Sequence, residues 1–135
     1  MSTTPHRFVD HVSEVELALE AESQPALFRE ATAAFRELVD TRRSTGEALR
    51  FDVSLGPARP EVLLVDWLDE LVFLAEVEGF IPERVVRLEL GEGRLDARLE
   101  GRRGRPRHIV KGATFHDLEL ARLEEEWHAR VVLDV

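Results

Sequence analysis

The chain has 135 residues, 44% of them hydrophobic and 33% charged, which is the composition of a globular domain. Its 27 acidic and 18 basic residues give a formal net charge of −9, so the surface as a whole repels phosphate and is not expected to bind nucleic acid directly. No cysteine is present, which excludes disulfides and thiolate metal sites. We expect a cytoplasmic protein without a membrane-spanning segment, whose partner is basic or is a cation held by His, Asp and Glu.

The first half of the chain predicts two strands with a helix between them. Hydrophobic residues alternate with glutamates over 15–22, which is the period of a strand with one buried face. Over 27–38 the hydrophobic residues recur at helical spacing, and Ser23 or Gln24 can cap that helix. Alternation returns over 49–55, where we expect the second strand.

A second helix and a hairpin are expected next. The helix runs from residue 61 to about residue 76 and is apolar on most of its circumference, which predicts that it is the most buried element. The alternating segments 86–90 and 95–99 are joined by a glycine-containing turn, and together they predict a β-hairpin.

Two more strands, at about 108–121 and 127–134, close the chain. The order of strand, helix, strand, helix and four strands predicts an α+β fold. We expect one domain over residues 1–135, in which two helices pack on one face of a mixed, mainly antiparallel sheet and the other face is solvated.

The sequence signatures of common enzyme classes are absent. The chain has no phosphate-binding loop, no dinucleotide-binding glycine motif, no serine nucleophile elbow and no His-Glu-x-x-His motif. It has no cysteine nucleophile, and no serine lies in a recognisable nucleophile setting. We therefore expect a protein that is not itself an enzyme.

Acidic residues stand near the first strand and at the end of the last one. Asp10, His11 and Glu14 precede or begin the first strand, and Asp134 and Val135 follow the last hydrophobic residues. One interpretation is the acidic edge of a solvated sheet face. The other is a site for a hard divalent cation, because such ions prefer several converging oxygens and the terminal carboxylate of Val135 would add to them. Spacing alone leaves both open.

Three polar residues in the middle and late parts of the chain are candidates for either a structural or a functional role. Asp66 lies within the nearly apolar helix, where a carboxylate is costly unless it is paired. We expect it at a rim, or facing Lys111, His116 or an arginine of the basic cluster at 102–107, and a structural ion pair would explain it as well as a functional one. His116 shares strand parity with leucines and is expected on a half-buried face as a core residue or a ligand. Lys111 could reach a carboxylate or a phosphate, or be simply exposed.

Four blocks carry a family resemblance: Asp-His-Val-Ser-Glu at 10–14, Leu-Val-Asp-Trp-Leu-Asp-Glu-Leu at 64–71, Lys-Gly-Ala-Thr-Phe-His at 111–116 and Val-Leu-Asp-Val at 132–135. They resemble the archease family. Its usual forms are Asp-His-Thr-Ala/Ser-Asp, Leu-Val-Asp-Trp-Leu-Asn-Glu-Leu, Lys-Ala-Val-Thr-Tyr-His and a closing Ile-Phe-Asp-Ile or Val-Leu-Asp-Val. The blocks follow the family order and span essentially the whole chain.

The resemblance implies a small α+β protein that acts as a cofactor of the RtcB-type RNA ligase. That ligase joins RNA 2′,3′-cyclic-phosphate or 3′-phosphate ends to 5′-hydroxyl ends in tRNA splicing and RNA repair, and archeases promote its guanylylation and multiple turnover. The family metal site, which holds calcium in known members, implies Glu14, Asp134 and Val135 as ligands. Two positions depart from the family: Glu14 replaces the usual Asp, and Glu16 replaces a glycine.

Two other functions remain open on the sequence alone. One is an acidic, chaperone-like module that recognises basic proteins without a metal. The other is a metal-dependent hydrolase that uses Glu14, His116 and Asp134, which would require these residues to be enclosed.

Overall fold

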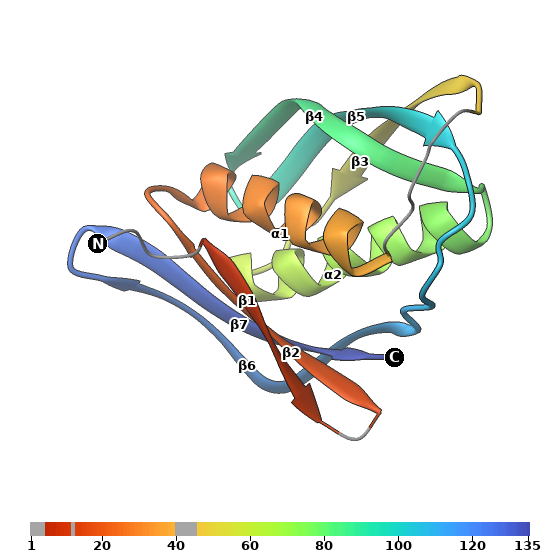
Figure 1. The fold of residues 1–135 in the computed structure, drawn as a ribbon. Helices are drawn as coiled ribbons and strands as arrows, with labels where there is room; N and C mark the ends of the chain where they lie inside the picture. The colour runs from red at the N-terminus through yellow and green to blue at the C-terminus, as the bar shows by residue number, and fades with distance from the viewer. Residues whose placement is uncertain (1–4, 12, 40–45) are drawn as a thin grey trace.

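The computed structural model describes residues 5–11, 13–39 and 46–135, and its two helices lie between two β-sheets (Figure 1). The helices are α1 (Gln24–Val39) and α2 (Pro60–Glu76). Neither of these helices is long and apolar enough to cross a membrane.

The larger sheet has four strands in the order β1-β2-β7-β6. Their bounds are His6–His11 for β1, Glu14–Ala21 for β2, Gly112–Leu123 for β6 and Glu126–Asp134 for β7. The smaller sheet has the order β3-β5-β4. Its strands are β3 (Ala48–Leu55), β4 (Phe80–Gly91) and β5 (Arg94–Arg103). Every strand pair in the described residues is antiparallel.

Local sequence accounts for where the elements begin and how they pack. The hydroxyl of Ser23 accepts a hydrogen bond from the N–H of Ala26 at 3.2 Å and so caps α1, as its position predicted. Along β2 buried residues alternate with half-buried ones, because one face packs on α1. The largest fully buried side chain of the core is Trp67 of α2.

The α+β class and the mainly antiparallel strands are confirmed, but the strands divide into two sheets instead of one. The reason lies in α2, whose apolar circumference cannot be covered from one side. It contacts β6 of the larger sheet on one side, and β3 and β4 of the smaller sheet on the other. β1 was not expected, because it is a polar edge strand in which only Phe8 and Val9 are hydrophobic.

Candidate functional site

At one corner of the larger sheet, the start of β2 lies beside the end of β7. Glu14 of β2 lies directly opposite Asp134 of β7, which in turn lies opposite Gly112 of β6. The N–H of Val135 donates to the carbonyl oxygen of Ser13 at 3.1 Å, which ties the residue after β7 to the β1–β2 turn. We call Glu14, Asp134 and Val135 the acidic corner. The three residues implied as metal ligands therefore lie next to one another.

Among the residues that the structure describes, Glu14 and Asp134 have no cationic partner. Directly opposed residues of antiparallel strands point to one face of the sheet, so Glu14 and Asp134 share a face. On the same face of β2, Glu16 lies 3.7 Å from the guanidinium of Arg130. Within the described ranges, by contrast, no side-chain hydrogen bond or ion pair neutralises Glu14 or Asp134. An uncompensated set of oxygen donors fits a hard divalent cation such as calcium.

The structure describes the other candidate residues near the acidic corner only in part. Asp10 and His11 belong to β1, which pairs with β2, and their side chains lie outside the part of the chain that the structure describes. Lys111 is exposed. Its N–H donates to the carbonyl oxygen of Asp134 at 2.8 Å, so the backbone of Lys111 borders the acidic corner.

Beside the acidic corner, Asp69 of α2 reaches β6. Its Oδ1 accepts a hydrogen bond from the N–H of Ala113 at 2.7 Å. Burial raises the pKa of Asp69, the Ala113 N–H opposes this, and the charge of Asp66 adds to the increase. Asp66 is half-buried, which confirms the rim position. Among the described residues, no hydrogen bond or ion pair joins it to Lys111, His116 or an arginine.

Sequence reasoning did not single out Asp69 as a candidate. The available signal was its spacing, because Asp66 and Asp69 are three residues apart and so lie on one helical face. A contact between that face and β6 could not be read from either segment alone.

His116 is exposed, so the prediction of a half-buried face is wrong. The pairing of β6 with β7 changes register between Thr114 and Glu119, and Asp117 has a φ of 54°. This bulge interrupts the alternation on which the prediction depended. The side chain of His116 is 73% exposed, and its Nε2 lies 3.2 Å from the carboxylate of Asp117.

The basic cluster at 102–107 is engaged within the protein. The Nε of Arg102 lies 3.6 Å from Glu83, and the Nε of Arg103 lies 2.7 Å from Glu47. These ion pairs connect the end of β5 to β4 and to the segment before β3. At least these two arginines therefore have a structural role.

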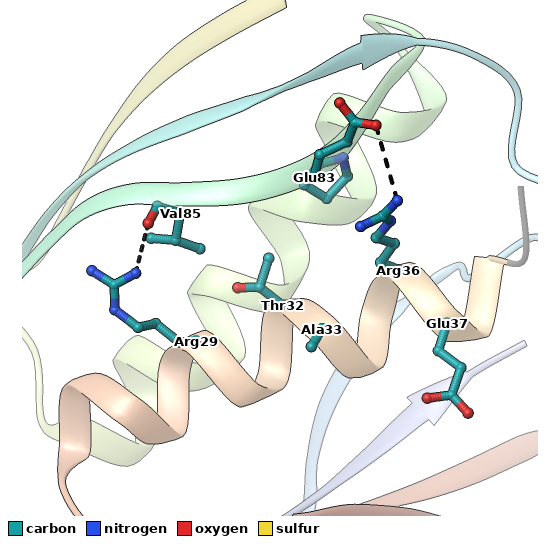
Figure 2. A pocket seen from close by; sticks show the side chains of 8 residues that line it. Arg29, Thr32, Ala33, Arg36, Glu37, Glu83 and Val85 are labelled. Atoms are coloured by element: carbon teal, nitrogen blue, oxygen red, sulfur yellow. Dashed lines mark hydrogen bonds and ion pairs between the residues drawn. The ribbon is translucent and has the colours of Figure 1, made fainter. Parts of the chain in front are cut away.

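A groove of about 470 Å³ lies between α1 and β4 (Figure 2). Two arginines border it. Arg29 donates to the carbonyl oxygen of Val85 at 2.6 Å, and Arg36 lies 3.9 Å from Glu83. None of the residues predicted from the sequence lines this groove. Its cationic groups already have partners, so it is not the site that those residues form.

A second group of possible metal ligands lies at the far end of β2. Glu20, Glu126 and His128 place ligand atoms within 4.8 Å of one another and could hold a metal ion. A hydrogen bond with Glu20 raises the pKa of the exposed Glu126, and the charge of Glu20 adds to this. Glu20 is six residues from Glu14, about 20 Å along a strand. The group was missed because Glu20 and His128 become neighbours only through the β2–β7 register.

Comparison with known proteins identifies the family. Residues 6–135 match the archease protein family (MTH1598/TM1083). The chain belongs to the archease family. This confirms the resemblance of the four sequence blocks, and the match includes the acidic corner, α2 and β6.

Individual archeases cover nearly the whole chain. The protein archease of Methanosarcina acetivorans is 31% identical over a 140-residue alignment that spans 96% of this chain and 95% of the relative. That of Methanosarcina barkeri is 27% identical with the same coverage. The solution structure of Methanobacterium thermoautotrophicum protein 1598 has a TM-score of 0.71 at 24% identity and covers 97% of this chain and 99% of that one. The crystal structure of a Thermotoga maritima archease, described as a possible chaperone, has a TM-score of 0.67 at 18% identity and covers 100% and 98%.

Proposed function

We propose that this protein is a non-catalytic activator of an RtcB-type RNA ligase, acting in the cytoplasm in tRNA splicing or RNA repair. It would promote guanylylation of the ligase and so allow repeated turnover. Membership of the archease family supports this proposal, as does the presence of all four blocks on which the resemblance depends.

The observation that carries the proposal is the acidic corner. Glu14 and Asp134 lie side by side on one face, without a cation among the described residues to neutralise them. We infer that the two carboxylates, together with Val135, hold a divalent cation, with calcium as the expected ion. Glu14 is one methylene longer than the usual Asp, and it still supplies the required oxygens. When bound, the ion would supply positive charge for a nucleotide phosphate or for carboxylates of the partner.

An activator needs no nucleophile of its own. It changes the rate of another enzyme by binding one state of that enzyme more tightly than another. The residues of the acidic corner would bind the guanylylation-competent state of the ligase and orient its charged groups. The coupling free energy between two binding sites is typically about 1–3 kcal/mol. A coupling of this size changes a binding equilibrium about 5- to 150-fold.

The test is a multiple-turnover assay with purified RtcB-type ligase, GTP and RNA ends, with and without the protein. Glu14→Gln and Asp134→Asn are expected to reduce the stimulation about tenfold or more. Glu16→Gln is the matched control, because Glu16 lies on the same face of β2 but is paired with Arg130. Unchanged stimulation by both corner variants would remove the acidic corner from the mechanism.

A chaperone-like function without a metal is the second candidate. The observation in its favour is that the Thermotoga maritima archease is described as a possible chaperone. A general chaperone would suppress aggregation of unrelated basic proteins, and Glu14→Gln would act no more strongly than Glu16→Gln. Dependence of ligase turnover on Glu14 with no effect on aggregation would exclude it.

A further inference from the structure

One side of α2, together with β6, carries two carboxylates and two exposed aromatic side chains: Asp66, Asp69, Phe73 and Phe115, which we call the α2–β6 rim. We propose that this rim is a docking surface for a protein segment that brings an arginine or lysine to Asp66 and an apolar side chain to Phe115. The inference rests on the proposed function, under which the segment belongs to the RNA ligase.

The rim is one surface because α2 and β6 lie side by side in opposite directions. Asp69, in the second half of α2, is hydrogen-bonded to Ala113, the second residue of β6. Glu61, near the start of α2, lines a groove together with Leu118, farther along β6. The hydrogen bond and the shared groove together indicate that the helix and the strand run in opposite directions.

The same geometry places Asp66 and Phe115 at a similar height and joins the rim to the acidic corner. From the α2–β6 hydrogen bond, Asp66 lies about 4.5 Å back along the helix. Phe115 lies about 6.6 Å in the same direction along the strand. At the other end of the rim, Gly112 lies opposite Asp134 of the acidic corner.

In the described part of the chain, no basic side chain pairs with Asp66 of the rim. Asp66 is half-buried and, among the described residues, has no hydrogen bond or ion pair. Partial burial of the Asp69 carboxyl raises its pKa, the Ala113 N–H opposes this, and the charge of Asp66 adds to the increase. A cation from a partner would relieve this, and a charge-assisted hydrogen bond at such a half-buried position is stronger than one between neutral groups.

The aromatic side chains of the rim are exposed, and Phe115 lies in the segment of β6 that is not paired with β7. Phe115 is 61% exposed and Phe73 is 46% exposed. The segment 115–118 falls outside the register with β7, and β6 is the edge strand of its sheet. Proteins usually cover or charge such edges, and exposed aromatic side chains are enriched at interfaces.

Charge complementarity selects the occupant. The two carboxylates repel phosphate, so a nucleic acid is unsuitable. A second copy of the chain in a twofold arrangement would bring Asp66 and Asp69 against the same carboxylates, which is unfavourable. A protein segment with a basic side chain beside apolar ones complements both parts of the rim.

The experiment measures binding and turnover separately with the full-length protein and purified RtcB-type ligase. Asp66→Asn and Phe115→Ser are each expected to weaken binding about tenfold, the effect of removing a central interface contact. High concentrations of these variants should restore turnover, whereas Glu14→Gln should keep its stimulation reduced about tenfold or more even at saturating concentration. Val86→Ser is the control, because Val86 is 49% exposed on β4, in the other sheet. Melting temperatures equal to that of the unmodified protein exclude misfolding.

The outcomes distinguish this inference from the proposed function. If the protein stimulates the ligase and the two rim variants bind as tightly as Val86→Ser, the rim is not the docking surface and the proposed function stands. If the unmodified protein neither binds nor stimulates the ligase, the proposed function fails and the rim inference fails with it.

Discussion

The indole N–H of Trp67 donates a hydrogen bond to the hydroxyl of Thr32 at 2.9 Å, in the middle of the core. Thr32 in turn donates to the carbonyl oxygen of Phe28 at 2.9 Å. This chain satisfies the polar atom of the largest buried side chain and connects α2 to α1. It holds in place the helix on which the α2–β6 rim is built.

Thr32→Val is expected to destabilise the protein by about 1–3 kcal/mol, because it leaves a buried indole N–H without an acceptor while keeping the shape of the side chain. Urea unfolding measures the change. Thr32→Ser retains the hydroxyl and is expected to cost less. An equal loss in both variants would show that packing of the methyl group, rather than the hydrogen bond, is the source of the stability.

His6 of β1 is expected to make stability depend on pH. Its Nδ1 is bonded to Glu30 and its Nε2 lies 2.6 Å from Glu37, both on α1. Burial lowers the pKa of His6, but the hydrogen bonds and charges of the two glutamates outweigh it and raise the pKa above 6.5. The contribution is therefore complete below pH 6.5 and is lost as the pH rises through the raised value in the folded state.

Urea unfolding of the unmodified protein and of His6→Gln from pH 5 to pH 9 tests this contribution. We expect the stability difference between the two to shrink as the pH rises. His116→Gln is the matched control, because His116 is exposed on the opposite edge strand of the same sheet. Parallel curves for the unmodified protein and His6→Gln would contradict the assignment.

Periodicity in the sequence predicted the helices and strands that have one hydrophobic face and one polar face. Leucines alternating with glutamates located β2, and the helical stripe located α1, because each buries one face. The second sheet was missed, although the apolar circumference of α2 already indicated that this helix needs cover on two sides. β1 was missed because an edge strand with two hydrophobic residues has no such pattern.

The sequence predicted those residues of the candidate site that are recognised by residue type. It did not predict features that depend on how the strands pair. The four blocks pointed to Glu14 and Asp134, and the β2–β7 register places these two residues together. The exposure of His116 could not be predicted, because the bulge at Asp117 reverses the strand parity locally. The Glu20–His128 pair likewise depends on register alone.

Two glycines of the smaller sheet differ in the space around them. A Cβ at Gly101 of β5 would collide with the carbonyl oxygen of Ile81, whereas one at Gly91 would have no atom within 4 Å. Gly101→Ala is expected to lower the free energy of unfolding by about 1–3 kcal/mol, because the two strand backbones must move apart. Gly91→Ala is expected to change it by less than about 0.5 kcal/mol. Similar effects of the two substitutions in chemical denaturation would contradict this packing.

Calcium is expected to stabilise the protein through the acidic corner. An ion that binds only the folded state adds about 2.7 kcal/mol at a concentration 100 times its dissociation constant. Thermal unfolding with excess calcium should therefore show a higher melting temperature, and Glu14→Gln and Asp134→Asn should abolish the increase. Glu20→Gln should retain it, because Glu20 belongs to the group with Glu126 and His128 at the far end of β2. The reverse result, an increase lost in Glu20→Gln and kept in Glu14→Gln, would move the calcium site to that group.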